Sequence, residues 1–108
     1  MAPAPLFTVA EARETLADLL PVIAEFIALR ADVLEFGEGR ERLDALLGTI
    51  QDTGVEVKGF APLLLDFPAE FEGEVVDLCW LEGDMQLAWY HRSDHGFAGR
   101  RPLPFDAV

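Results

Sequence analysis

The sequence contains few of the residues that mark the common functional classes. Cys79 is its only cysteine, which excludes an intrachain disulfide and a zinc motif built from cysteines. Its only serine, Ser93, lacks the sharp turn that surrounds the nucleophile of a serine hydrolase. No Walker-type phosphate-binding loop is present either. The best-known nucleophile and nucleotide motifs are therefore not indicated.

Long uninterrupted apolar runs are also missing. The longest apolar stretch, residues 19–34, is broken by Glu25, Arg30 and Asp32, so we do not expect a membrane-spanning helix. The N-terminus has no basic segment followed by a long apolar run, as a secretory signal would have. We therefore expect a cytoplasmic protein.

Basic residues are scarce, with 8 Lys and Arg against 20 Asp and Glu and a net charge of -12. Such a surface repels nucleic acid and anionic membranes, and neither is an expected partner. The charge is uneven, because residues 92–108 carry three arginines and two aspartates, a net +1, which leaves -13 for residues 1–91. A locally positive segment on an acidic body suits a small anion or a carboxylate of a partner.

The chain does contain enough apolar residues, 51% of 108, to build the core of a globular fold. We expect a single domain over residues 1–108, of the α+β class. A long N-terminal α-helical hairpin is expected at about residues 8–54. It would pack on a small antiparallel β-sheet of about three strands, which together with a C-terminal loop occupies about residues 55–105.

The helical half has clear boundary signals. Thr8 and Glu11 have the spacing of a capping box at a helix start. The helical spacing of apolar residues continues to about Phe36, and Pro21, well inside it, is expected to kink the helix or divide it in two. Glycines then end the helix, and a second helix is expected at about residues 40–53.

The first helix has more apolar surface than one small subunit can cover. Two apolar seams run along it, and together they span well over half of its circumference. The first seam comprises Leu16, Leu20, Ile23, Ile27 and Leu34, and the second comprises Leu19, Val22, Phe26, Leu29 and Val33. We expect one of the two seams to be buried in a homodimer.

After Gly54 the apolar spacing changes to the alternation of strands. A strand in "LLLDFP" is expected to end at Pro68. Residues 73–91 form the clearest hairpin, with a two-residue turn within "EGD". That turn places His91 and both tryptophans on the face towards the helices, with Asp77 and Cys79 on the opposite face.

Several fragments, taken in order, resemble one family. They are "FTVAEA", "GVEVK", "LLDFP", "LCWLEGD", "WYH" and "GFAGRRPL". Together they resemble the bacterial family known as domain of unknown function 2203, over nearly the whole chain. Pro21 and a second histidine, His95, depart from the family pattern. The family has no established activity, so the resemblance implies the outline of the fold and no mechanism.

The segment at residues 89–101 is the candidate site, since it holds both histidines and three of the eight basic residues. The candidate ligand-binding residues are His91, Asp94, Arg100 and Arg101. Structural support is expected from Asp66, Glu74, Asp77 and Phe97.

One interpretation of this segment is a metal site, in which His91, His95 and Asp94 are joined by a strand acid, Asp66 or Glu74. Histidines four residues apart in a loop do not converge on one ion as they would on a helix. A structural histidine that donates to a nearby carboxylate is therefore favoured, and neither a metal nor a cofactor is assigned. Depending on the register of the turn, Glu74 or Val76 is expected opposite His91. Asp66, at the end of the preceding strand, is the other acidic side chain expected near the histidine.

The arginines also allow two interpretations. The glycines of "GFAG" can expose backbone N–H groups, and an adjacent guanidinium can bind a carboxylate or phosphate. The favoured alternative is an internal clamp, in which Phe97 fills the core and Arg100 forms an ion pair with Asp66, Asp77 or Asp94.

Two classes of function follow. The favoured one is a non-enzymatic homodimeric binding or assembly module with an unknown protein partner. The alternative is a small metal- or ligand-dependent enzyme that uses His91, Asp94 and Arg100. We favour the module because the polar candidates come almost entirely from one short segment, whereas enzyme pockets gather polar groups from several elements.

Overall fold

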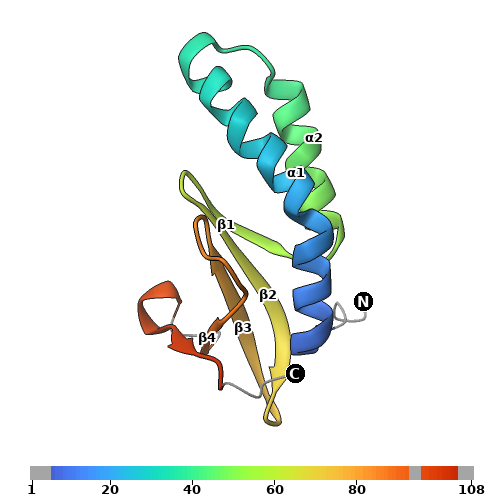
Figure 1. Ribbon diagram of the computed structural model, residues 1–108, viewed down its shortest axis with the longest axis vertical. Coiled ribbons are helices and arrows are strands. Elements are labelled where there is room, and N and C mark those ends of the chain that lie inside the picture. Colours follow the sequence, from blue (N-terminus) through green and yellow to red (C-terminus); the bar gives the residue numbers. More distant parts are fainter. Residues whose placement is uncertain (1–5, 93–95, 105–108) are drawn as a thin grey trace.

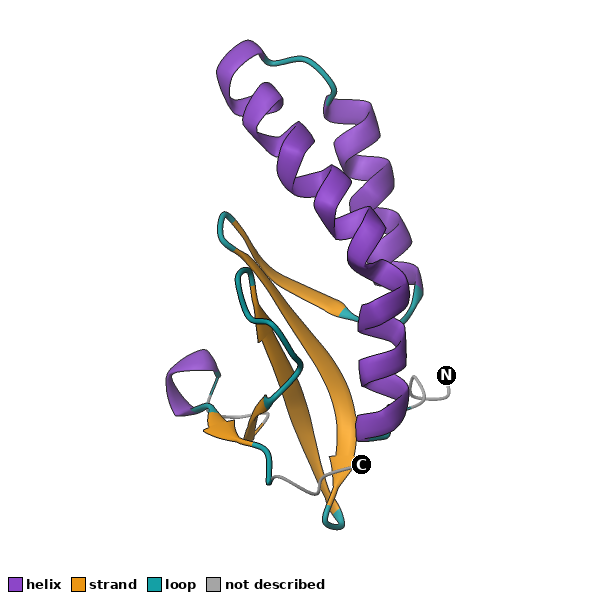
Figure 2. Cartoon of the chain, viewed as in Figure 1, coloured by secondary structure: helices purple, strands orange, loops and turns teal. Residues whose placement is uncertain are grey.

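The structure is a computed structural model that describes residues 6–92 and 96–104. Two helices are followed by an antiparallel sheet with the strand order β1-β2-β3-β4-β5 (Figures 1 and 2). The elements are α1 (Val9–Phe36), α2 (Arg40–Asp52), β1 (Glu56–Phe60), β2 (Leu63–Phe71), β3 (Glu74–Leu81), β4 (Trp89–Arg92), the 3-10 helix η1 (Phe97–Gly99) and β5 (Arg101–Pro102). The α+β class is confirmed, but the sheet has five strands and not about three.

The start of α1 is the predicted capping box. The backbone N–H of Glu11 donates to Thr8 Oγ1 at 3.0 Å, and that of Thr8 donates to Glu11 Oε1 at 2.9 Å. Pro21 does not divide the helix, which is continuous from Val9 to Phe36. Proline leaves the carbonyl of Ala17 without its helical partner, and because Ala17 is exposed, water can hydrate that oxygen.

The two helices do not form a clear hairpin that packs on the sheet as a unit, in contrast to the prediction. α2 has 13 residues against 28 in α1, so it lies beside only the C-terminal half of α1 (Figure 1). The N-terminal half of α1 covers the sheet, whereas the far end of the helix pair projects beyond it (Figure 2). α1 therefore covers β2, whereas α2 contacts the edge strand β1.

The hydrophobic core lies between α1 and the inner face of the sheet. Alternate residues of β2 and β3 point towards the helix, as expected for a sheet with one face on the core. The buried apolar side chains of the helices and these two strands are Val9, Ala12, Leu16, Leu19, Ile23, Phe26, Leu46, Ile50, Leu63, Leu65, Phe67, Ala69, Val76, Leu78 and Trp80.

The pairing of β3 with β4 differs from the predicted hairpin. Asp77 pairs with His91, so both side chains lie on the outer face of the sheet, away from α1. The prediction that His91 and Trp89 face the core with Trp80 is therefore wrong. The prediction that Glu74 or Val76 lies opposite His91 is also wrong. A register shift of one residue transfers every side chain to the other face.

The reason for the shift is the connection between the two strands, residues 82–88, which is longer than a two-residue turn. Asp84 closes its first part, because the Trp80 indole N–H donates to the Asp84 carbonyl at 3.0 Å and the Leu81 N–H donates to Asp84 Oδ2 at 2.9 Å. Leu87 is then buried in the core. The connection contributes to the core instead of continuing the ladder.

Strand β2 does not end at Pro68, as was expected, but continues to Phe71. The Pro68 carbonyl accepts a hydrogen bond from the Phe7 N–H at 2.8 Å, so it faces the N-terminal segment and not β3. The missing N–H of Pro68 faces the same edge, beyond the last pair of β1 with β2, Glu56 with Asp66. Proline is tolerated there because no ladder hydrogen bond is lost.

Candidate functional site

The outer face of the sheet carries a buried polar cluster of Asp66, Asp77, Cys79 and His91. β2 provides Asp66, β3 provides Asp77 and Cys79, and β4 provides His91. Asp66 pairs with Cys79 and Asp77 pairs with His91, which brings all four to one face. None is more than 9% exposed. Burial of so many ionisable groups is costly unless they are paired or bind an ion.

His91 makes the central contacts of the cluster. Its Nε2 lies 3.2 and 3.1 Å from Asp66 Oδ1 and Oδ2, and its Nδ1 lies 2.9 Å from the Arg92 carbonyl oxygen. A carbonyl can only accept, so Nδ1 carries a hydrogen. Nε2 therefore donates to Asp66 when the ring is a charged imidazolium, and has a free lone pair when the ring is neutral.

The electrostatics reflect burial and the proximity of the two aspartates. Burial would lower the pKa of His91, but the Arg92 carbonyl and the Asp66 carboxylate outweigh it and raise the pKa above its usual value. Burial, and then Asp66, raise the pKa of Asp77. Burial and Asp66 also raise the pKa of Cys79 to about 11. Cys79 is therefore a protonated thiol at neutral pH without a bound cation, as expected of a thiol beside carboxylates.

Three members of the cluster have the donor atoms of a metal site. A carboxylate oxygen of Asp66, the Cys79 sulfur and a ring nitrogen of His91 lie within 4.8 Å of one another. The set combines oxygen, sulfur and nitrogen, which zinc accepts together. Sequence reasoning named Asp66 and His91 but not Cys79, since its predicted register separated the cysteine from the histidine.

The remaining predicted site residues lie elsewhere. Glu74 is at the far end of β3, where Arg92 is 3.5 Å from its carboxylate. Arg101 is exposed in β5, opposite Tyr90. The predictions for Asp94 and His95 fall outside the residues that the structure describes.

Arg100 links the C-terminal segment to the sheet. Its guanidinium lies 4.4 Å from the ring centroid of Trp89 and 4.8 Å from that of Phe97, and its Nη1 donates to Asp84 Oδ2 at 3.2 Å. The acid is not one of the three named in advance, and Phe97 is an exposed side chain that stacks on Arg100. Arg100 thus has one ion pair and two aromatic contacts, which are the interactions expected of an internal clamp.

A second feature is the side of α1 that neither the sheet nor α2 covers. Neither predicted seam remains exposed as a whole, because the core takes Leu16 and Ile23 from one seam and Leu19 and Phe26 from the other. What remains is a row of exposed or half-buried apolar residues, here called the α1 row: Ala17, Leu20, Ala24, Ile27, Ala31 and Leu34.

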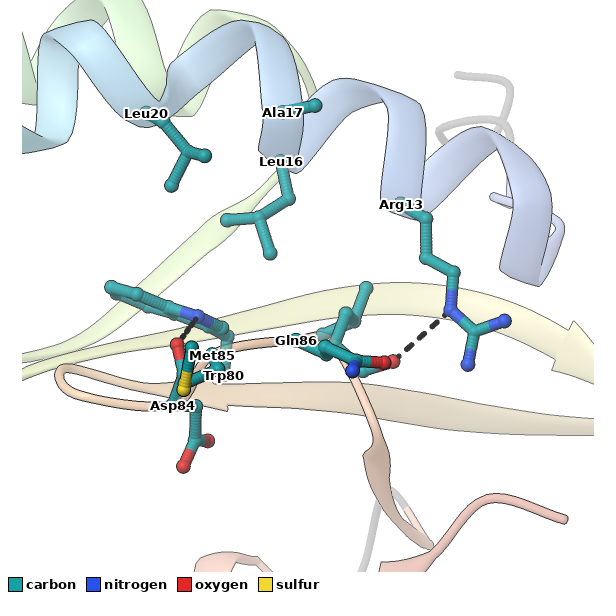
Figure 3. A pocket seen from close by; sticks show the side chains of 9 residues that line it. Arg13, Leu16, Ala17, Leu20, Trp80, Asp84, Met85 and Gln86 are labelled. Atoms are coloured by element: carbon teal, nitrogen blue, oxygen red, sulfur yellow. Dashed lines mark hydrogen bonds between the residues drawn. The ribbon is translucent and has the colours of Figure 1, made fainter. Parts of the chain in front are cut away.

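A cavity of about 240 Å³ lies beside the N-terminal end of the α1 row. Figure 3 shows Leu20 and Leu16 of α1 above it and Trp80 and Met85 below. Met85 is 96% exposed, an unusual position for a long apolar side chain. The cavity and the α1 row thus form one continuous apolar surface.

One family model, described as an uncharacterized conserved protein (DUF2203), matches residues 34–103 of the chain. No curated protein matches it, and neither does any solved structure. Among the helices of the described residues, none has the length and apolar character needed to cross a membrane.

Proposed function

The chain belongs to the DUF2203 family of uncharacterized conserved proteins, and we propose that it acts as a homodimeric assembly module whose two copies join along the α1 row. The observation that carries this proposal is the spacing of the row. Ala17, Leu20, Ala24, Ile27, Ala31 and Leu34 alternate at three and four residues. This is the a/d repeat of a coiled-coil seam, whereas a helix that packs only on its own subunit has no need of a second apolar stripe.

The composition of the row favours an antiparallel partner helix. Every a-type position is an alanine, and every d-type position is leucine or isoleucine. In an antiparallel pair of identical helices, a positions face d positions. The row then forms three kinds of layer, Ala17 with Leu34, Leu20 with Ala31, and Ala24 with Ile27, each of which joins a small side chain to a large one. Such alternation allows close packing without voids.

The same arrangement gives the cavity an occupant. Leu34 is 76% exposed and lies near the far end of α1. In the antiparallel pair, Leu34 of the second copy lies over Ala17, beside Leu20 and Met85, which line the cavity (Figure 3). Apolar side chains exposed at both ends of the row would become buried in one interface, which is the usual reason for a continuous apolar surface.

Neither an enzyme nor an anion site forms part of the proposed function. His91 is 3% exposed, and the Arg100 guanidinium already has Asp84, Trp89 and Phe97 as partners. A substrate or anion would have to displace these contacts to reach either side chain.

Sedimentation equilibrium of the purified chain tests the proposal. We expect wild-type protein to be a dimer at micromolar concentration and Leu20→Glu to be a folded monomer, because Leu20 is 49% exposed and contributes little to the core. Val75→Glu, at a residue 57% exposed on β3, is the matched control and should remain dimeric. A monomeric wild type, or equal dissociation of both variants, contradicts the proposal.

A charge-pair experiment tests the antiparallel register. Leu20 of one copy faces Ala31 of the other in the proposed pair, so Leu20→Glu combined with Ala31→Lys should restore the dimer that each single change weakens. Leu20→Glu combined with Leu34→Lys should not, because these positions are not opposite each other. Restoration by the second combination alone would refute the proposed register.

A further inference from the structure

We infer that Asp66, Cys79 and His91 bind a divalent zinc-type cation on the outer face of the sheet, independently of the proposed dimer. The three donor atoms lie within 4.8 Å of one another, and His91 Nε2 is 3.1 Å from Asp66 Oδ2. In a tetrahedral site with bonds of about 2.0–2.3 Å, ligand atoms are roughly 3.3–3.8 Å apart. Side-chain shifts of about 1 Å therefore close the set around one ion.

The orientation of His91 is that of a metal ligand. A ligating histidine usually donates its other ring N–H to a carboxylate or a backbone carbonyl, which fixes the ring and the tautomer. In this chain Nδ1 donates to the Arg92 carbonyl at 2.9 Å, and Nε2 is directed at Asp66. The neutral tautomer that this contact selects presents its lone pair to the cluster.

A structural ion pair explains only half of the cluster. An imidazolium and a carboxylate account for His91 and Asp66, but Cys79 and Asp77 are buried beside them on the same face. Two carboxylates, a thiol and one imidazole contain more acidic than basic groups. The Cys79 thiol has a hydrogen bond with Arg100, but the His91–Asp66 ion pair leaves an excess of acidic groups, which a divalent cation neutralises.

The chemistry of the donors favours zinc among the common divalent ions. Thiolate and imidazole are poor ligands for magnesium and calcium, which prefer oxygen. Asp77 pairs with His91 across β3 and β4 but is not one of the three residues whose donor atoms converge. Three protein ligands leave the fourth position of a tetrahedral zinc ion for a water molecule.

Binding has a simple proton balance. The thiol proton of Cys79 and the proton that His91 shares with Asp66 leave as the cation enters, and the Asp66 carboxylate keeps its charge. The ion then joins β2, β3 and β4 through side chains as well as through backbone hydrogen bonds. β4 is only four residues long, so it gains most from this additional connection.

Cobalt(II) titration of the metal-free chain tests the site. Because Cys79 is the only cysteine, a sulfur-to-cobalt charge-transfer band in the near-ultraviolet can come only from this site. We expect that band at one cobalt per chain, and its loss on addition of one equivalent of zinc. Cys79→Ser should lose the band, and His91→Gln should weaken binding roughly tenfold or more.

Glu56→Gln is the matched control, because Glu56 pairs with Asp66 on the neighbouring strand but is half exposed and lies 3.4 Å from Lys58. It should bind cobalt as the wild type does. Circular dichroism establishes that each variant is folded. For a measurement that needs no variant, the zinc K-edge spectrum of the loaded wild type should show one sulfur neighbour together with nitrogen and oxygen.

Three results would overturn the inference. They are a folded wild type that shows no sulfur band with cobalt, a Cys79→Ser protein that retains the band, and a zinc spectrum without a sulfur neighbour. Leu20→Glu should leave the cobalt band unchanged, so failure of the metal site and failure of the dimer are distinguishable.

Discussion

Substitution of Arg100 by alanine removes the ion pair with Asp84 and the contact with Trp89, which join the C-terminal segment to the rest of the sheet, and a contact with Phe97 within that segment. Each cation–π contact, with Trp89 at 4.4 Å and Phe97 at 4.8 Å, contributes about 0.5–2 kcal/mol, according to how far it is desolvated. The ion pair joins Arg100 to Asp84, with both side chains 19% exposed. It adds about 1 kcal/mol, between the values for surface and buried charged pairs. We expect Arg100→Ala to lower the free energy of unfolding by about 1–3 kcal/mol once regained side-chain entropy is subtracted.

Urea unfolding followed by circular dichroism measures this loss, at fixed protein concentration and with a chelator present. Arg100→Lys is the matched control, because it keeps the charge near Asp84 but loses the planar group that stacks on the two rings. The free energy of unfolding of Arg100→Lys should lie between those of the wild type and Arg100→Ala. A loss below about 0.5 kcal/mol for Arg100→Ala, typical of an unremarkable surface position, would refute the clamp and favour a ligand site.

Two further substitutions test the ends of α1 and its connection to the sheet. Hydrogen bonding to Arg30, at 2.7 and 3.0 Å, lowers the pKa of Glu82 below its ordinary value of 4.5. The ionised Glu82 side chain therefore stabilises the folded state above pH 4.5, and this contribution is lost as the pH falls through the lower pKa of the folded state. Glu82→Gln should therefore cost about 1–2 kcal/mol at pH 7 and flatten the acid limb of a urea-unfolding series, and an unchanged acid limb would contradict this. Thr8→Ala should lower the free energy of unfolding by about 1 kcal/mol through loss of the N-cap. Thr53→Ala, beyond the end of α2, is the comparison, and its thermal unfolding should differ less from that of the wild type.

The sequence was sufficient for the features that depend on neighbouring residues. The capping box of Thr8 and Glu11, the end of α1 at Phe36 and the second helix from Arg40 are all found where they were expected. The polar cluster could not be found in this way, because it depends on which face of β4 carries His91. That face is decided by residues 82–88, where Leu87 enters the core and Asp84 binds Trp80. The burial of Leu87 in the core, together with the Asp84–Trp80 hydrogen bond, thus overrode the two-residue turn that "EGD" suggests.

The excess apolar surface of α1 was predictable, but its position was not. The core draws Leu16 from one predicted seam and Leu19 from the other, because the sheet and α2 approach the helix from different directions. The residual row contains alanines, which neither seam included. Small residues carry little weight in an apolar pattern, yet at a helix–helix interface they determine how closely two backbones approach.

Among the described residues, the connection at residues 82–88 contacts both proposed sites. Met85 and Leu87 line the cavity beside the α1 row, and the carboxylate of Asp84 accepts from Arg100 on the side of the polar cluster. Arg100→Ala should therefore weaken both dimerisation and cation binding, because it changes the conformation of residues 82–88. In contrast, Cys79→Ser changes only a cluster donor and Leu20→Glu only the α1 row, so each of these should alter one property and leave the other intact. A loss of dimerisation in Cys79→Ser would mean that the sheet and the α1 row behave as one cooperative unit, because Cys79 lies on the outer face of the sheet and Leu20 on the helix that covers the inner face.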